Sequence, residues 1–93
     1  MALMPDTHLT EPFAVITVLY FAHVAELTGT RQESWPLDAP ISAAQWLEQV
    51  QARYPALGSV QRLKIAINQY HANHTAEIRP GDEVAVFEPV TGG

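Results

Sequence analysis

Apolar residues are concentrated in three short runs that predict β-strands. Residues 14–21 and 84–87 are rich in β-branched and aromatic side chains, as expected of strands buried in a sheet. In residues 63–68, apolar side chains alternate with more polar ones, which predicts a strand with one face on the core. Pro80-Gly81 precedes the last run and predicts a turn, because Gly accepts the positive φ of a type II turn.

Two further elements are predicted after the first strand. Residues 22–27 are helix formers, and Gly29 is placed to end a short helical turn in the left-handed conformation. Residues 31–37 then predict a second strand that forms a hairpin with the first. Pro36 indicates an edge position for this strand, since proline has no N–H to donate to a neighbouring strand.

The main helix is predicted to begin after Ser42 and to end before Pro55. Ser42 and Gln45 fit a capping box, in which each side chain accepts a hydrogen bond from the backbone N–H of the other residue. The apolar side of this helix is formed by residues at helical spacing: Ala43, Trp46, Leu47, Val50 and Tyr54.

This order of elements predicts an α+β fold, a β-grasp in which a mixed sheet carries one main helix across one face. The crossover through the helix requires a parallel pairing, which the first and last strands provide if they lie side by side. A chain of 93 residues forms one domain. We expect a flexible N-terminal leader at residues 1–13, the β-grasp domain at residues 14–88 and an extended C-terminal tail at residues 89–93.

Strand alternation predicts an apolar surface on the face of the sheet that the helix leaves uncovered. If Ile16, Val18 and Tyr20 point at the helix, the side chains between them point away from it. The outward apolar residues of three strands would then form one surface, here named the outer patch: Leu19, Phe21, Ala66, Ala85 and Phe87. Such patches mark partner sites. A reversed assignment of the two faces, or a loop over the patch, would remove this surface.

Composition and charge exclude several classes of function. Ten Asp and Glu against five Lys and Arg give a net charge of −5, which disfavours nucleic acid as a partner. No apolar run approaches the roughly 20 residues that span a bilayer, and residues 1–12 lack the regions of a secretory signal. We therefore expect a cytoplasmic protein without a membrane partner. Because there is no cysteine, a disulfide, a thiolate metal site and a catalytic thiol are impossible.

The sequence predicts neither a metal site nor a self-sufficient active site. His71 and His74 have the spacing of a metal-binding pair only on a helix, whereas their segment looks like a loop or a hairpin. The chain has no Gly-rich phosphate loop and no nucleophile elbow. We expect no bound cofactor, and no catalysis by this chain alone.

The C-terminal Gly92-Gly93 is the remaining candidate for chemistry. Glycine has no Cβ, so a Gly-Gly end can pass through a channel too narrow for other residues, and an enzyme can reach the carboxylate of Gly93. A frayed end of small residues is the alternative interpretation.

Four segments resemble one known family. They are LYFAHVAELTGT at residues 19–30, AINQ at residues 66–69, and PGDEVAVF followed by PVTGG at residues 80–87 and 89–93. Together they resemble the small subunit of molybdopterin synthase, the MoaD-type sulfur carrier with a ubiquitin-like β-grasp fold, over residues 15–93. The chain departs from the family pattern at Glu88 and His71, where apolar residues or proline are usual.

The resemblance implies a role for Gly93 in molybdenum cofactor biosynthesis. In the family, an E1-like adenylyltransferase uses ATP to adenylate the terminal carboxylate, and a sulfur donor converts it to a thiocarboxylate. The tail then enters the large subunit, which supplies the catalytic residues, and sulfur passes to cyclic pyranopterin monophosphate. The expected assembly is a heterotetramer of two small and two large subunits.

The resemblance also assigns a partner interface and leaves two rivals open. Gly92 would let the tail thread into the large subunit, and the expected interface residues are Leu19, Phe21, Phe87, Pro89, Val90 and Thr91. A thiamine-pathway sulfur carrier would share the fold and the activation step. A ubiquitin-like protein modifier would instead join Gly93 to a lysine of a target protein.

Overall fold

The centre of the protein is a five-stranded mixed sheet, described for residues 14–89 in a computed structural model. The strands lie in the order β2-β1-β7-β4-β5. Their bounds are β1 Val15–Tyr20, β2 Gln32–Pro36, β4 Lys64–Ile67, β5 Tyr70–Ala72 and β7 Glu83–Phe87. The pair β1–β7 is parallel, and the other pairs are antiparallel. The predicted parallel pairing of the first and last strands is therefore confirmed, and with it the α+β β-grasp fold.

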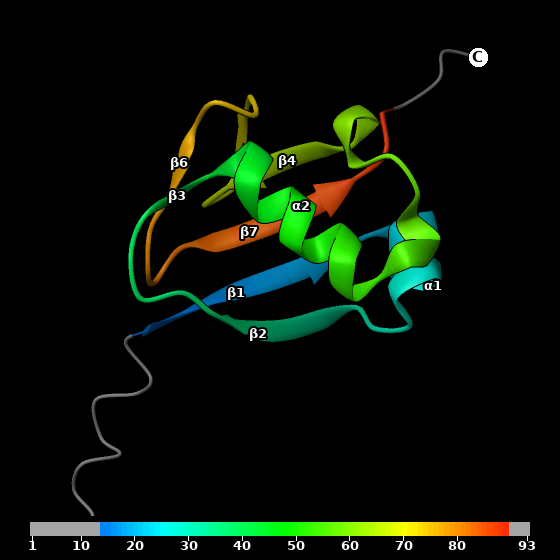
Figure 1. Cartoon of the computed structure of the whole chain (residues 1–93), viewed down its shortest axis with the longest axis horizontal. Coiled ribbons are helices and arrows are strands. Elements are labelled where there is room, and N and C mark those ends of the chain that lie inside the picture. Colours follow the sequence, from blue (N-terminus) through cyan, green and yellow to red (C-terminus); the bar gives the residue numbers. More distant parts are fainter. Residues whose placement is uncertain (1–13, 90–93) are drawn as a thin grey trace, which may run out of the picture.

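Helices and short strands complete the described part of the chain. Helix α2 (Ala43–Arg53) crosses one face of the sheet, and α1 (Ala22–Thr28) follows β1 at one end of it (Figure 1). Two 3₁₀ turns, η2 (Pro55–Leu57) and η3 (Val60–Arg62), connect α2 to β4. A separate two-stranded sheet pairs β3 (Ile41–Ser42) with β6 (Glu77–Ile78). Neither α-helix in residues 14–89 has the length and apolar character needed to cross a membrane.

The core lies between α2 and the inner face of the sheet. The side chains that meet there are fully buried: Ile16 and Val18 of β1, Val84 and Val86 of β7, and Ala43, Trp46, Leu47 and Val50 of α2. Each large apolar side chain buried in this way stabilises the fold by about 1.5–3 kcal/mol. The predicted inward faces of the first and last strands, and the predicted apolar side of the main helix, are confirmed.

The start of α2 contains only half of the predicted capping box. Ser42 is the N-cap, and its hydroxyl accepts a hydrogen bond from the Gln45 backbone N–H at 3.2 Å. The reciprocal bond is absent from the described contacts of this turn, and the Gln45 side-chain oxygen lies 3.3 Å from the Ser42 hydroxyl instead. Ser42 also belongs to β3, where it pairs with Glu77. The expected capping box was therefore wrong in its second half, because the Gln45 side chain accepts from the Ser42 hydroxyl and not from its backbone N–H.

Strand β2 is an edge strand, as Pro36 predicted. Its first residue is also protected, because the Thr30 hydroxyl lies within hydrogen-bond distance of both the backbone N–H and the C=O of Gln32. Proline at one end and a hydroxyl at the other leave few free backbone groups for pairing with another chain.

A carboxylate holds β1, β2 and the end of α2 together. Only 15% of the Glu33 side-chain surface is exposed, and its carboxylate accepts hydrogen bonds from the hydroxyls of Tyr20 at 2.6 Å and Tyr54 at 2.9 Å. Arg53 lies 3.7 Å from the same carboxylate. Burial first, and then the hydrogen bond to Glu33, raise the pKa of Tyr20 far above its usual value. Tyr54 is shifted in the same direction for the same reasons, so its pKa is also raised.

We predict that the protein loses stability at alkaline pH through Tyr20. A group with a raised folded-state pKa contributes stability that is complete below its unfolded pKa and is lost as the pH rises. Above pH ~10 the unfolded chain releases the Tyr20 proton that the folded protein keeps, so the free energy of unfolding falls by about 1.4 kcal/mol per pH unit from this group. Urea unfolding between pH 8 and about 11 measures the slope. The variant Tyr20→Phe should show a shallower slope above pH ~10, and equal slopes for the two proteins would contradict the assignment.

Candidate functional site

The outer patch exists on the face of the sheet opposite α2. Its middle row is formed in register across three strands, where Ala85 of β7 pairs with Leu19 on one side and Ala66 on the other. Phe87 lies farther along β7 and pairs with Lys64. Leu19, Ala85 and Phe87 are half-buried, whereas Ala66 is buried and adds little exposed surface to the patch. The prediction that these side chains face away from the helix is confirmed, and the reversed assignment is excluded.

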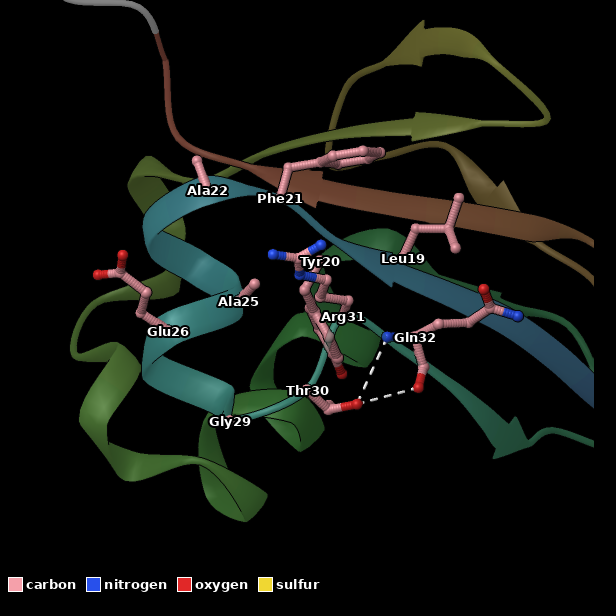
Figure 2. A pocket seen from close by; sticks show the side chains of 10 residues that line it. All are labelled: Leu19, Tyr20, Phe21, Ala22, Ala25, Glu26, Gly29, Thr30, Arg31 and Gln32. Atoms are coloured by element: carbon pink, nitrogen blue, oxygen red, sulfur yellow. Dashed lines mark hydrogen bonds between the residues drawn. The ribbon is translucent and has the colours of Figure 1, made fainter.

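Phe21 is the most exposed aromatic side chain of the outer patch. Phe21 is 49% exposed, although hydrogen bonds hold its backbone on both sides. The Phe21 N–H donates to the Val86 carbonyl at 3.2 Å, and the Phe21 carbonyl accepts from the Val24 N–H at 3.0 Å. Figure 2 shows Phe21 and Leu19 on the same side of β1. A backbone that is already held in place, with an exposed aromatic ring, suits a contact surface, because little conformational entropy is lost on binding.

Ala22 makes the sharp turn that separates β1 from α1. It has a φ of 50°, in the left-handed region that residues with a Cβ avoid. The turn comes directly after Phe21, the residue that follows β1, and it starts the helix. The strained residue therefore lies next to the exposed ring of the outer patch.

A groove continues from the outer patch between β1, α1 and the start of β2 (Figure 2). Its volume is about 670 Å³, and it shares Leu19 and Phe21 with the patch. Arg31 gives the groove a cationic group. Gly29, which also lines it, has a φ of 80° and ends α1, as the sequence predicted.

Two polar residues adjoin Phe87 at the end of β7. The His71 ring packs edge-on against the Phe87 ring, with centroids 5.5 Å apart and planes at 75°. Glu88 follows Phe87, and its Oε2 lies 2.9 Å from Arg62 Nη1 and 3.3 Å from His23 Nδ1. The hydrogen bond from Arg62, followed by that from His23, lowers the pKa of Glu88. These are the two positions at which the sequence departs from the family pattern.

The sequence did not indicate the partners of Glu88. Arg62 is 26 residues away and His23 is 65 residues away, and no local motif connects them. Of the expected site residues, Leu19, Phe21, Phe87 and Pro89 are described by the structure. Val90, Thr91, Gly92 and Gly93 lie outside the described residues, as does the expected leader at residues 1–13.

Residues 18–93 match the ThiS family. The molybdopterin synthase sulfur carrier subunit of Homo sapiens is 35% identical over 86 residues, which cover 88% of this chain and 98% of that protein. The chain belongs to the family of molybdopterin synthase sulfur carrier subunits. The family member from Escherichia coli (strain K12) is 37% identical over 81 residues, with 85% of this chain and 100% of that protein covered.

Solved structures agree with this assignment of the fold. SAMP1 from Haloferax volcanii matches with a TM-score of 0.71 and 26% identity, and the match covers 85% of this chain and 99% of SAMP1. The putative molybdopterin converting factor subunit 1 from Pyrococcus furiosus also has a TM-score of 0.71 and 26% identity, over 83% of this chain and 99% of its own. The predicted ubiquitin-like β-grasp fold is confirmed.

We predict that Ala22→Gly stabilises the protein. Glycine adopts a positive φ without the clash that a Cβ causes, so the free energy of unfolding should rise by about 0.5–1 kcal/mol in urea denaturation. A matched control is Ala52→Gly on the exposed side of α2, where the same substitution should cost about 0.5–1 kcal/mol. A loss of stability in both variants would show that Ala22 is not strained.

Proposed function

We propose that this chain is the sulfur-carrying small subunit of a molybdopterin synthase, and that the carboxyl group of Gly93 carries the sulfur. One observation carries the proposal: in a member of this family, β7 brings the outer patch to within a few residues of a Gly-Gly terminus. Phe87 ends the strand, and the chain reaches Gly93 six positions later.

The proposed chemistry uses the C-terminus in place of a thiol. A carboxylate is a poor electrophile, so an E1-like adenylyltransferase joins it to the AMP part of ATP and releases pyrophosphate. A sulfur donor, at the oxidation level of sulfide, then displaces AMP and leaves a thiocarboxylate on Gly93. The chain has no cysteine, so no side-chain thiol competes for this sulfur.

Sulfur delivery takes place in the large subunit. The thiocarboxylate sulfur of Gly93 bonds to a carbon of cyclic pyranopterin monophosphate while a carbon–oxygen bond at that carbon breaks, and the oxygen leaves as the phosphate group or as water. A further water molecule then cleaves the acyl–sulfur bond, which leaves a thiol on the pterin and restores the carboxylate of Gly93. Two carriers act in turn, because the dithiolene product holds two sulfur atoms. The large subunit supplies the catalytic residues, and the expected complex contains two small and two large subunits.

The tail and the outer patch have separate tasks in this scheme. Four extended residues reach about 13–14 Å, which is enough to connect a docked domain with a buried active site. Gly92 and Gly93 have no side chains to obstruct a narrow entry. Phe21, Phe87 and Leu19 form the docking surface, with Pro89, Val90 and Thr91 as further contacts along the tail.

A protein modifier is the second candidate function. The structural likeness to SAMP1 favours it, since a related structure from the same organism is described as small archaeal modifier protein 1. Both functions begin with activation of the terminal carboxylate and differ in the acceptor. A thiamine-pathway carrier would differ in the same way, so co-purification of this chain with a synthase large subunit separates the proposed function from both alternatives.

We predict that the mass of the intact chain reports the activation. Incubation with an E1-like enzyme, ATP and a sulfur donor should shift the mass by the exchange of one oxygen for one sulfur. Deletion of Gly93, or addition of one residue after it, should abolish molybdopterin formation without unfolding the domain. A residue added before Met1 is the matched control and should leave activity unchanged. Normal molybdopterin formation by the C-terminally extended chain would refute the proposal.

We predict that charge on the outer patch prevents docking. Phe21→Asp and Phe87→Asp should each weaken binding to the large subunit by about tenfold or more in titration calorimetry, as loss of an aromatic anchor does. Tyr70 is a matched control, because it is an exposed aromatic residue on the other face of the sheet. It is 78% exposed, and it pairs with Ile67, whose side chain packs on the core. Tyr70→Asp should bind like the unmodified chain. Equal losses in all three variants would show that the outer patch is not the docking surface.

A further inference from the structure

Glu88 connects the folded domain to the C-terminal tail and is tethered at two points. One carboxylate oxygen, Oε2, lies 2.9 Å from Arg62 Nη1 and 3.3 Å from His23 Nδ1. Arg62 belongs to η3 and His23 to α1, so the two tethers come from separate elements. Figure 1 shows α1 at the same end of the sheet as the end of β7. The three residues are here named the Glu88 anchor.

The backbone at the anchor is restricted as well. Pro89 follows Glu88, and a residue before proline is held in extended conformations by the proline ring. Proline itself has a nearly fixed φ of about −65°. Side-chain tethers and backbone restriction therefore act at the same place, where the chain leaves β7.

The contribution of the Glu88 anchor to global stability is small. Arg62 and His23 are about half exposed, and the Glu88 side chain is 29% exposed. Ion pairs with this exposure contribute little to folding, because water and salt screen them. The lowered pKa of Glu88 agrees with a carboxylate that stays charged and paired near neutral pH. The effect of the anchor must therefore be local.

We propose that Glu88 is a positioning residue that, held by Arg62 and His23, fixes the direction in which the tail leaves the domain beside Phe87. The expected effect on activation of Gly93 rests on the function proposed above, whereas the effect on the direction of the tail does not. A tail whose root already has the required direction loses less conformational entropy when it enters an enzyme, which improves binding of the free carrier. Once the tail is bound, the anchor has no further part in the reaction.

The first test measures the tail in the free, full-length chain. Glu88→Ala removes both tethers and keeps Pro89. We expect lower heteronuclear ¹⁵N NOE values for the amides of Val90 to Gly92, with an unchanged midpoint of thermal unfolding. The double variant Arg62→Glu/Glu88→Arg reverses the stronger pair and should restore at least half of the lost NOE. Equal NOE values in Glu88→Ala and the unmodified chain would overturn the proposal, whatever the enzyme assays give.

The second test measures activation by an E1-like enzyme. Glu88→Ala should raise the KM for the carrier about two- to fivefold, the size of effect expected from an exposed ion pair, with kcat within about twofold. The control is Glu77→Gln, which breaks an exposed ion pair to Arg79 with a 3.0 Å contact away from the tail, and it should change neither constant. A fall in kcat at constant KM would overturn a positioning role, because it would place Glu88 at the reacting group.

The two tests separate failure of the anchor from failure of the proposed function. If the unmodified chain is never adenylated, the sulfur-carrier function fails, and the NOE comparison still decides the anchor. If the unmodified chain is adenylated and the NOE values do not respond to Glu88→Ala, only the anchor fails.

Discussion

Strands β1 and β7 come from opposite ends of the described chain and lie side by side in parallel at the centre of the sheet. Because the pair is parallel, the C-terminal ends of both strands lie at the same end of the sheet. Phe21 follows β1 there, and Phe87 ends β7, so the two aromatic residues of the outer patch are neighbours. The same geometry places α1, which continues β1, beside the root of the tail and brings His23 to Glu88. An antiparallel pairing would put these groups at opposite ends of the sheet.

Strands β1 and β7 present different kinds of residue on the two faces of the sheet. Their inward residues, such as Val18 and Val84, are completely buried under α2 and hold the domain together. Their outward residues, such as Leu19 and Ala85, remain half-buried on the opposite face. Substitutions on the outward face can therefore change docking without removing core contacts. Stability and recognition are divided between alternate residues of one strand, because successive side chains point to opposite sides.

Periodic patterns predicted the large elements, and their limits follow from physical causes. The alternation in β1 and the helical spacing in α2 gave the correct inward faces, since each pattern extends over several residues. The two-residue strands β3 and β6 are too short to show a period, and they were not predicted. The outer patch could be predicted from alternation and the resemblance, whereas the Glu88 anchor depends on contacts between distant segments that no local pattern encodes.

Lys64, which pairs with Phe87 on β4, is the only lysine of the chain. In a protein whose carboxyl terminus is activated as an acyl adenylate, every free amine is a competing nucleophile that would form a wasteful amide bond. Here the side-chain amines are reduced to one, and it lies next to an aromatic residue of the proposed docking surface. Under the proposed function, a partner docked on the outer patch would cover that amine, so the chain would be poorly suited to become the target of its own activated end.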